Sequence, residues 1–215
     1  IIIVADTGAV KSVLSGPDGV FAAIKPGSLV IDMGTTLLPA TRSFAQEAGE
    51  KDCFYVDAPV SGGTIGAEAG NLTIMAGGSE QAFTMALPVL KVLGERITHV
   101  GSVGAGQVAK AANQVIVGLN IGAVAEALAL AKAAGVDPGR VCDALKGGFA
   151  DSRILEVHGQ RMVSGSYEPG AKSTIQRKDM HQAIELAAEL DLDMPATTLS
   201  RDLYDQLIAS GGANL

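Results

Sequence analysis

The spacing of apolar residues changes once along this chain, near residue 104, and this change constrains the fold more than any other feature. Before residue 104, short apolar segments alternate with segments of helical spacing, and glycine, proline and aspartate residues separate them. Such alternation is typical of an α/β domain with a parallel sheet. After residue 104, one helical pattern follows another to the end of the chain. We therefore expect an α/β domain over residues 1–101 and an all-helical domain over residues 102–215.

The same punctuation predicts the individual strands and helices. Strands are expected at residues 1–4, 29–32, 53–58, 72–76 and 97–100. Helices are expected in the first domain at residues 7–14, 19–24, 39–50 and 80–93, with Thr7 as a possible cap of the first. In the second domain they are expected at residues 107–134, 138–146, 154–163, 172–190 and 197–209. The branched apolar residues 1–4 predict a buried strand, and such a start suggests that the chain is the middle of a larger protein.

Composition excludes several classes of protein. The chain has 16 lysines and arginines against 23 aspartates and glutamates, and the net charge of −7 argues against a nucleic-acid partner. Hydrophobic residues make up 47% of the chain, which excludes a disordered protein. Two cysteines are too few for a disulfide framework or a zinc cluster, so we expect a cytoplasmic protein without a metal site. Residues 115–131 are apolar but interrupted by Asn120 and Glu126, so no membrane span is expected.

Residues 104–109 match the dinucleotide-binding pattern GxGxxA, after an expected strand and before a helix. A pyrophosphate cradle requires a short βαβ unit with an acidic residue about 20 positions further on. Here a long helix follows the match, and no strand comes after that helix. A tight turn at a domain boundary is therefore the favoured interpretation, and the chain lacks a phosphate-binding loop of its own upstream of it.

Three further segments could carry chemistry. Residues 57–63 end a strand in small residues, where backbone N–H groups beside the Ser61 hydroxyl could hold a carboxylate; an ordinary glycine-rich turn is the alternative. One face of an apolar helix carries Gln107, Lys110, Asn113, Gln114 and Val117. Desolvation lowers the pKa of a lysine, which suits a proton donor, although a lone lysine more often extends to solvent. For Lys178 and Asp179, spacing alone favours an exposed surface pair.

Five segments in order resemble the signatures of the β-hydroxyacid dehydrogenase family, and the resemblance covers nearly the whole chain. They are residues 57–63, 70–78, 101–114, 148–152 and 178–179. The resemblance implies a partial Rossmann-like α/β domain, without its amino-terminal GxGxxG unit. An all-α domain follows, like the carboxyl-terminal domain of 6-phosphogluconate dehydrogenase. Roughly 60 residues, about two βαβ crossovers, would precede Ile1 in the whole protein.

The resemblance also implies an activity. Members interconvert a small carboxylate-bearing hydroxy acid and its semialdehyde, of the 3-hydroxyisobutyrate or 2-hydroxy-3-oxopropionate type, with NAD or NADP. Lys110 would be the general acid and base, and Asn113 would hold the substrate or the lysine. A homodimer or homotetramer is implied. The substrate carboxylate would bind Ser61, Gly62 and Gly63, and the cofactor would contact Val4, Ala5, Asp6, Thr35 and Lys178.

Several features depart from the family pattern and keep other functions open. The usual aromatic residue seven positions before Lys178 is Ala171, and the segment that selects NAD or NADP is absent. The chain alone could be a catalytically inactive fragment, or an oligomerising or binding module of the same fold. Retention of Lys110 and Asn113 argues against that alternative and against an imine reductase. Ala112, where 6-phosphogluconate dehydrogenases carry histidine, argues against that enzyme.

Overall fold

The structure, a computed structural model, describes residues 1–168 and 170–215. The chain forms two compact units, residues 1–113 and 114–215, each of which is described by itself. The division falls inside the long helix α6 (Ala105–Ala133), whereas the change in sequence pattern predicts a domain boundary at residue 101.

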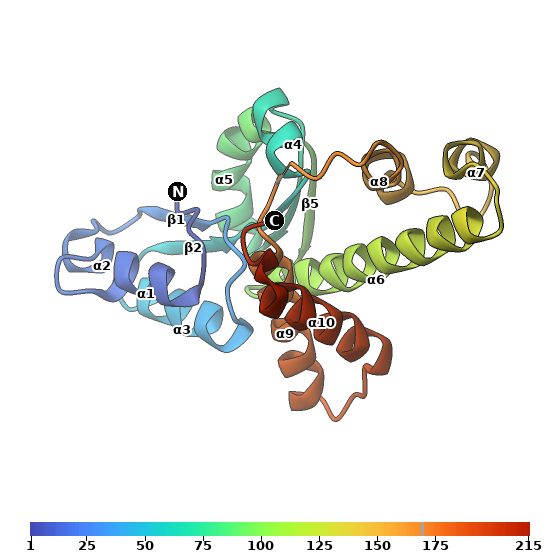
Figure 1. The fold of residues 1–215 in the computed structure, drawn as a ribbon. Coiled ribbons are helices and arrows are strands. Elements are labelled where there is room, and N and C mark those ends of the chain that lie inside the picture. The colour runs from blue at the N-terminus through green and yellow to red at the C-terminus, as the bar shows by residue number, and fades with distance from the viewer. Residues whose placement is uncertain (169) are drawn as a thin grey trace. The chain divides into compact units, whose positions relative to one another are not determined.

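Unit 1 contains, among the described residues, a five-stranded mixed sheet (Figure 1). The order is β1-β2-β4-β3, and β5 pairs with β4. The strands β1 and β2 are parallel, as are β4 and β5, but β4 runs antiparallel to β2 and β3. The expected wholly parallel sheet is therefore wrong, because a short strand and a seven-residue helix, rather than a long crossover helix, connect β2 to β4. The strands are β1 (Leu29–Asp32), β2 (Phe54–Asp57), β3 (Val60–Ser61), β4 (Leu72–Gly77) and β5 (Gly94–Gly101).

Helices cover both faces of this sheet, because its side chains alternate between two hydrophobic clusters. Val30 and Tyr55 pack on one face, whereas Ile31 and Val56, the next residue of each strand, pack on the other with Leu90. The first cluster includes residues of α1, α2 and α3, and the second includes residues of α5. The helices of unit 1 before α6 are α1 (Thr7–Ser15), α2 (Val20–Ala23), α3 (Leu38–Gly49), α4 (Gly63–Ala69) and α5 (Glu80–Leu93).

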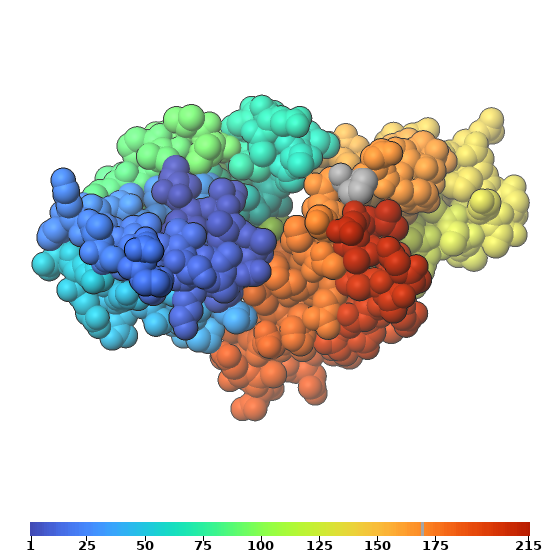
Figure 2. Space-filling view, turned by 60° about the vertical axis from the view of Figure 1, so that its left-hand side comes forward, coloured from blue at the N-terminus to red at the C-terminus, as the bar shows by residue number. Residues whose placement is uncertain are grey.

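The first four residues do not form the expected buried strand. Only Ile2 pairs with the sheet, through a single parallel bridge to Asp32, and its side chain is buried. Ile1 and Ile3 are 67% and 63% exposed, and the dark-blue end of the chain lies on the face shown in Figure 2. The alternation of side chains along an extended segment explains this difference: one residue in two faces the core.

Unit 2 is helical throughout its described residues and includes the carboxyl-terminal part of α6. Cys142 of α7 packs with Leu128 of α6 and Leu155 in one small core. Met180 and Ala183 of α9 are buried, and α9 packs along α10 (Figure 1). The helices are α7 (Pro138–Leu145), the π-helix η1 (Leu155–Gly159), α8 (Gln160–Ser164), α9 (Ser173–Glu189), α10 (Pro195–Leu207) and the π-helix η2 (Ile208–Gly212).

Helix α6 is both the longest helix of the described residues and strongly apolar. By length and composition alone its 29 residues could cross a membrane, whereas the polar residues in its sequence predict no membrane span. The core helix of a soluble protein passes the same test. Ile116 and Leu130 on this helix are 60% and 72% exposed within the single chain.

Candidate active site

The segment after β2 turns back on itself through two glycines with left-handed backbone angles. Gly62 has φ +133° and Gly63 has φ +60°. A Cβ atom at Gly62 would lie 3.2 Å from Leu72 Cδ2, so this position also has little space for a side chain. Ser61 pairs with Thr73 of β4, and Gly63 begins α4. The small residues after β2 therefore form a short strand, one turn residue and the start of a helix.

Helix α6 places Lys110 against this segment. Its side chain is buried, with 8% exposure, and Nζ donates a hydrogen bond to the backbone oxygen of Val60 at 2.9 Å. The alternative of a lysine extended to solvent is therefore wrong. Asn113 follows one turn later on the same helix and is half-buried. Unit 1 thus brings Lys110 together with the residues next to Ser61.

The loop after β1, which carries Thr35, is held from two sides. Asp32 accepts hydrogen bonds from Gly34 N at 3.0 Å, Thr36 Oγ1 at 2.7 Å and Tyr55 Oη at 3.1 Å. Gln107 of α6 holds the same loop with both ends of its amide. Its Oε1 accepts from Thr36 N, and its Nε2 donates to Gly34 O, each at 3.0 Å. Gln107 was only one polar position on a helix face in the sequence, and nothing there indicated this contact.

The residues expected on the adenosine side lie beside this loop. A Cβ atom at Gly34 would come within 3.2 Å of Val4 O, which places residue 4 at the carboxyl end of β1. Asp6, and not Thr7, caps α1, because Asp6 Oδ1 accepts from Ala9 N at 2.8 Å. Thr7 Oγ1 instead accepts from Leu37 N at 3.0 Å. In open α/β sheets, ligands bind outside the carboxyl ends of the strands, which is where these residues meet.

The GxGxxA match at residues 104–109 contacts an internal carboxylate. Asp57, fully buried at the end of β2, accepts from Gly104 N at 2.7 Å and from Gln107 N at 3.0 Å. These are backbone N–H groups at the start of a helix, the groups that a phosphate would need. Only Gly104 belongs to a turn, and residues 105–109 are already the start of α6. Because Asp57 occupies these amides, the geometry argues against a pyrophosphate cradle here.

The titration of Asp57 gives a prediction about stability. Burial raises the pKa of Asp57 to about 6, although its bonds to the Gly104 and Gln107 amides lower it. The folded protein then holds this proton more tightly than the unfolded chain does. This carboxyl therefore lowers the free energy of unfolding as the pH rises from about 4 to about 6. We expect Asp57→Asn to remove this decrease in the free energy of unfolding with pH, which is on the order of 3 kcal/mol.

Denaturant titrations of both proteins at several pH values measure this difference. The wild-type free energy of unfolding should fall relative to that of Asp57→Asn between these pH values and stay parallel to it above pH 7. Parallel curves throughout would contradict the prediction.

In unit 2, Lys178 forms an ion pair with a buried partner. Its Nζ lies 2.8 Å from Asp179 Oδ1, and Asp179 is 3% exposed. Asp179 Oδ2 accepts from Gln114 Nε2 at 2.7 Å. The interpretation of Lys178 and Asp179 as an exposed surface pair is therefore wrong. Lys178 and Lys110 belong to different units, so neither unit alone brings them together.

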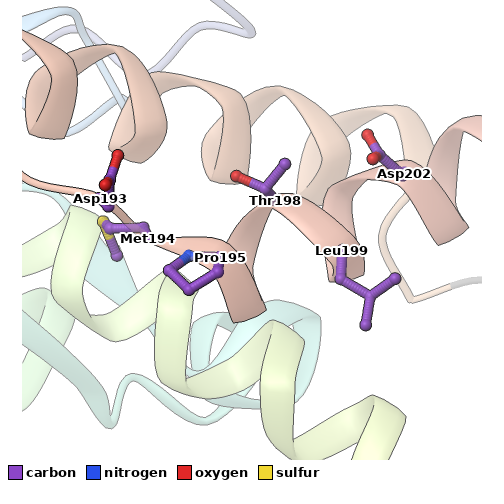
Figure 3. Close-up of a pocket in the computed structure, with 6 residues that line it drawn as sticks. All are labelled: Asp193, Met194, Pro195, Thr198, Leu199 and Asp202. Atoms are coloured by element: carbon purple, nitrogen blue, oxygen red, sulfur yellow. The ribbon is translucent and has the colours of Figure 1, made fainter.

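The hollow in Figure 3 lies beside the start of α10, and no predicted site residue lines it; its lining is Asp193, Met194, Pro195, Thr198, Leu199 and Asp202. Over residues 1–168 and 170–215, no group of three or more His, Cys, Asp or Glu side chains could hold a metal ion.

Comparison with known proteins adds independent findings. The family model of the NAD binding domain of 6-phosphogluconate dehydrogenase matches residues 1–101. The model described as NAD-binding of NADP-dependent 3-hydroxyisobutyrate dehydrogenase matches residues 104–215. The 2-hydroxy-3-oxopropionate reductase of Escherichia coli is 46% identical over 214 residues, which are 100% of this chain and 73% of that protein.

Two further relatives extend the comparison. The 2-(hydroxymethyl)glutarate dehydrogenase of Eubacterium barkeri is 38% identical over 93% of this chain and 67% of that protein. The crystal structure of 3-hydroxyisobutyrate dehydrogenase from Salmonella typhimurium has a TM-score of 0.89 and 31% identity. It covers 99% of this chain and 74% of that one.

These matches confirm the expected fold class, an α/β Rossmann-like domain followed by an all-α domain. They also confirm NAD or NADP as the cofactor. The family suggested by five short segments is the family that both models and the relatives identify. The chain belongs to the β-hydroxyacid dehydrogenase family of NAD(P)-dependent oxidoreductases.

Proposed function

We propose that the protein carrying this chain interconverts a small 3-hydroxy acid and its semialdehyde, with Lys110 as general acid and base. The substrate is of the 3-hydroxyisobutyrate or 2-hydroxy-3-oxopropionate type, the chemistry that the names of the similar proteins state. One observation carries the proposal: a buried lysine whose Nζ lies 2.9 Å from the backbone of Val60, next to Ser61. A proton donor fixed beside a small-residue segment can meet a small substrate held there.

Each predicted site residue of unit 1 then has a role in the reaction. Lys110 gives a proton to the carbonyl oxygen during reduction and takes it back from the hydroxyl during oxidation. Asn113 orients the substrate or the lysine. Ser61, Gly62 and Gly63 hold the substrate carboxylate, and the left-handed angles of the two glycines support a backbone that approaches a ligand closely. Three fixed contacts of this kind would orient the reacting carbon.

The cofactor side of the site lies at the carboxyl end of β1. Val4, Ala5 and Asp6 would contact the adenosine half and Thr35 the nicotinamide half. The close approach of Gly34 to Val4 O supports this placement, since a side chain at Gly34 would fill the space beside the strand end. Nicotinamide, when bound, donates or accepts the hydride. Lys178, held by the buried Asp179, would contact the cofactor. We place the functional boundary between the two domains near residue 101.

The exposed apolar residues of α6 support a homodimer or homotetramer. Ile116 and Leu130 are exposed on the single chain, and exposed apolar side chains that lie together commonly mark a protein contact. We propose that a second copy, and not a membrane, covers this part of α6, in a cytoplasmic enzyme. The net charge of −7 supports a function without nucleic acid.

The test uses the natural protein that carries this sequence. NAD(P)H fluorescence should change on titration, and NAD(P)H should then be oxidised with tartronate semialdehyde or methylmalonate semialdehyde. Binding without oxidation of either substrate would favour an inactive or binding module of the same fold. Absence of NAD(P)H binding would contradict the proposed function.

A further inference from the structure

Two side chains outside the proposed reacting groups fix the first turn of α6. Asp57, at the end of β2, accepts hydrogen bonds from the amides of Gly104 and Gln107. A carboxylate at the amino end of a helix is also favoured by the helix dipole. The first turn of α6 is therefore bonded to the end of a central strand of the sheet.

Gln107 continues the connection to the loop that carries Thr35. Its amide holds both Thr36 N and Gly34 O, the backbone groups on either side of that threonine. Asp32 also holds this loop, because its carboxylate accepts hydrogen bonds from Gly34 N and Thr36 Oγ1. Asp32 and Asp57 are paired residues at the ends of β1 and β2, so the carboxylate that holds the loop and the one that holds α6 are neighbours in the sheet.

The backbones around these carboxylates are closely packed. A Cβ atom at Gly106 would lie 2.4 Å from Met75 O and 2.7 Å from Asp57 O. At Gly77, it would lie 2.8 Å from Gly106 N. The backbones of α6, β2 and β4 are thus in direct contact, and a small shift of the helix would break several of these contacts at once.

Lys110 lies three residues after Gln107 on the same face of α6. We infer that Asp57 and Gln107 are positioning residues. They fix the position of Lys110 relative to the loop that carries Thr35, and so the position of the proton donor relative to the cofactor. This inference rests on the proposed function. It adds two residues that touch no reacting atom but set the distance between groups that do.

A double-mutant cycle tests the inference in the natural protein. Gln107→Met keeps the length of the side chain but removes both hydrogen bonds to the loop. We expect it to lower kcat by about tenfold to a hundredfold, because a misplacement of about 1 Å has effects of that size. In a Lys110→Met background the same substitution should lower the residual kcat by less than about twofold. Residues that act through one another are non-additive in such a cycle.

The readout separates positioning from a purely structural role. Partial unfolding would reduce the active fraction by the same factor in both backgrounds. An equal fold-decrease in kcat in the two backgrounds would therefore overturn the inference. An unchanged kcat in Gln107→Met would overturn it as well. Gln107→Glu keeps the acceptor for Thr36 N and should retain part of the activity. It replaces Gln107→Met in the double-mutant cycle if Gln107→Met does not fold. Gln81→Leu, an exposed site on α5, is the control and should leave kcat unchanged.

The failure of the inference differs from the failure of the proposed function. A folded wild-type protein that binds no NAD(P)H and oxidises none would contradict the proposed function, and the inference with it. If the wild type is active and the Gln107 substitution lowers kcat equally in both backgrounds, only the inference is contradicted.

Discussion

Replacement of Lys110 by methionine should lower kcat by a factor of about 10²–10⁴, the usual contribution of a general acid or base. Methionine has a similar length and no ionisable group, so it fills the buried site without supplying the proton. The hydrogen bond from Nζ to Val60 O is lost as well, but the helix that carries residue 110 remains bonded to Asp57 through Gln107 N. Cofactor binding should therefore persist while turnover falls.

Steady-state kinetics with both semialdehydes, together with NAD(P)H titration of the same preparation, measure this effect. Lys91→Met removes an exposed lysine of α5 and is the matched control, with no expected change in kcat. Retention of kcat within about threefold in Lys110→Met would remove Lys110 from its proposed role. A loss of NAD(P)H binding in parallel with kcat would point instead to a disturbed fold.

The second large effect is expected from Gly106→Ala, which should lower the free energy of unfolding by about 3 kcal/mol, at the upper end of the usual cost of overpacking. The added methyl group would lie 2.4 Å from Met75 O and 2.8 Å from Asp57 Oδ2. The first of these atoms belongs to the backbone of a central strand and cannot rotate away. The helix must therefore move from the sheet and weaken the two bonds to Asp57.

Gly122→Ala on the same helix is the matched control, because nothing lies within 4 Å of the position of its added methyl group. Alanine is about 1 kcal/mol more favourable than glycine inside a helix, so this variant should be more stable than the wild type. Denaturant unfolding of the three proteins measures both effects. Equal or higher stability of Gly106→Ala would contradict the close packing described for this helix.

Local sequence patterns predicted most of the elements, since strands and helices depend on nearby residues. The strand Leu29–Asp32 and the helix Glu80–Leu93 have the expected bounds, and the long helix begins within two residues of its expected start. The direction of β4 was not predictable in the same way. Its antiparallel pairing depends on the turn at Gly62 and on the short β3, and two residues give no periodic pattern.

The candidate site was predictable only as separate pieces. The position of Lys110 on a helix face followed from spacing, but its contact with Val60 joins residues 50 positions apart. The buried state of Asp179 depends on Gln114, which is 65 positions away. Contacts of this kind arise from tertiary packing, and one sequence without its fold contains no local signal for them.

The carboxylate at the start of α6 also affects how dinucleotide-binding sites are found by motif searches. A search for GxGxxA would match residues 104–109 as a dinucleotide-binding motif. The Gly104 and Gln107 amides, however, already donate hydrogen bonds to Asp57, which lies 47 and 50 positions before them. An acidic residue at the carboxyl end of a neighbouring strand should therefore count against such a match. A protein engineer who wished to place a second nucleotide at this turn would first have to remove Asp57.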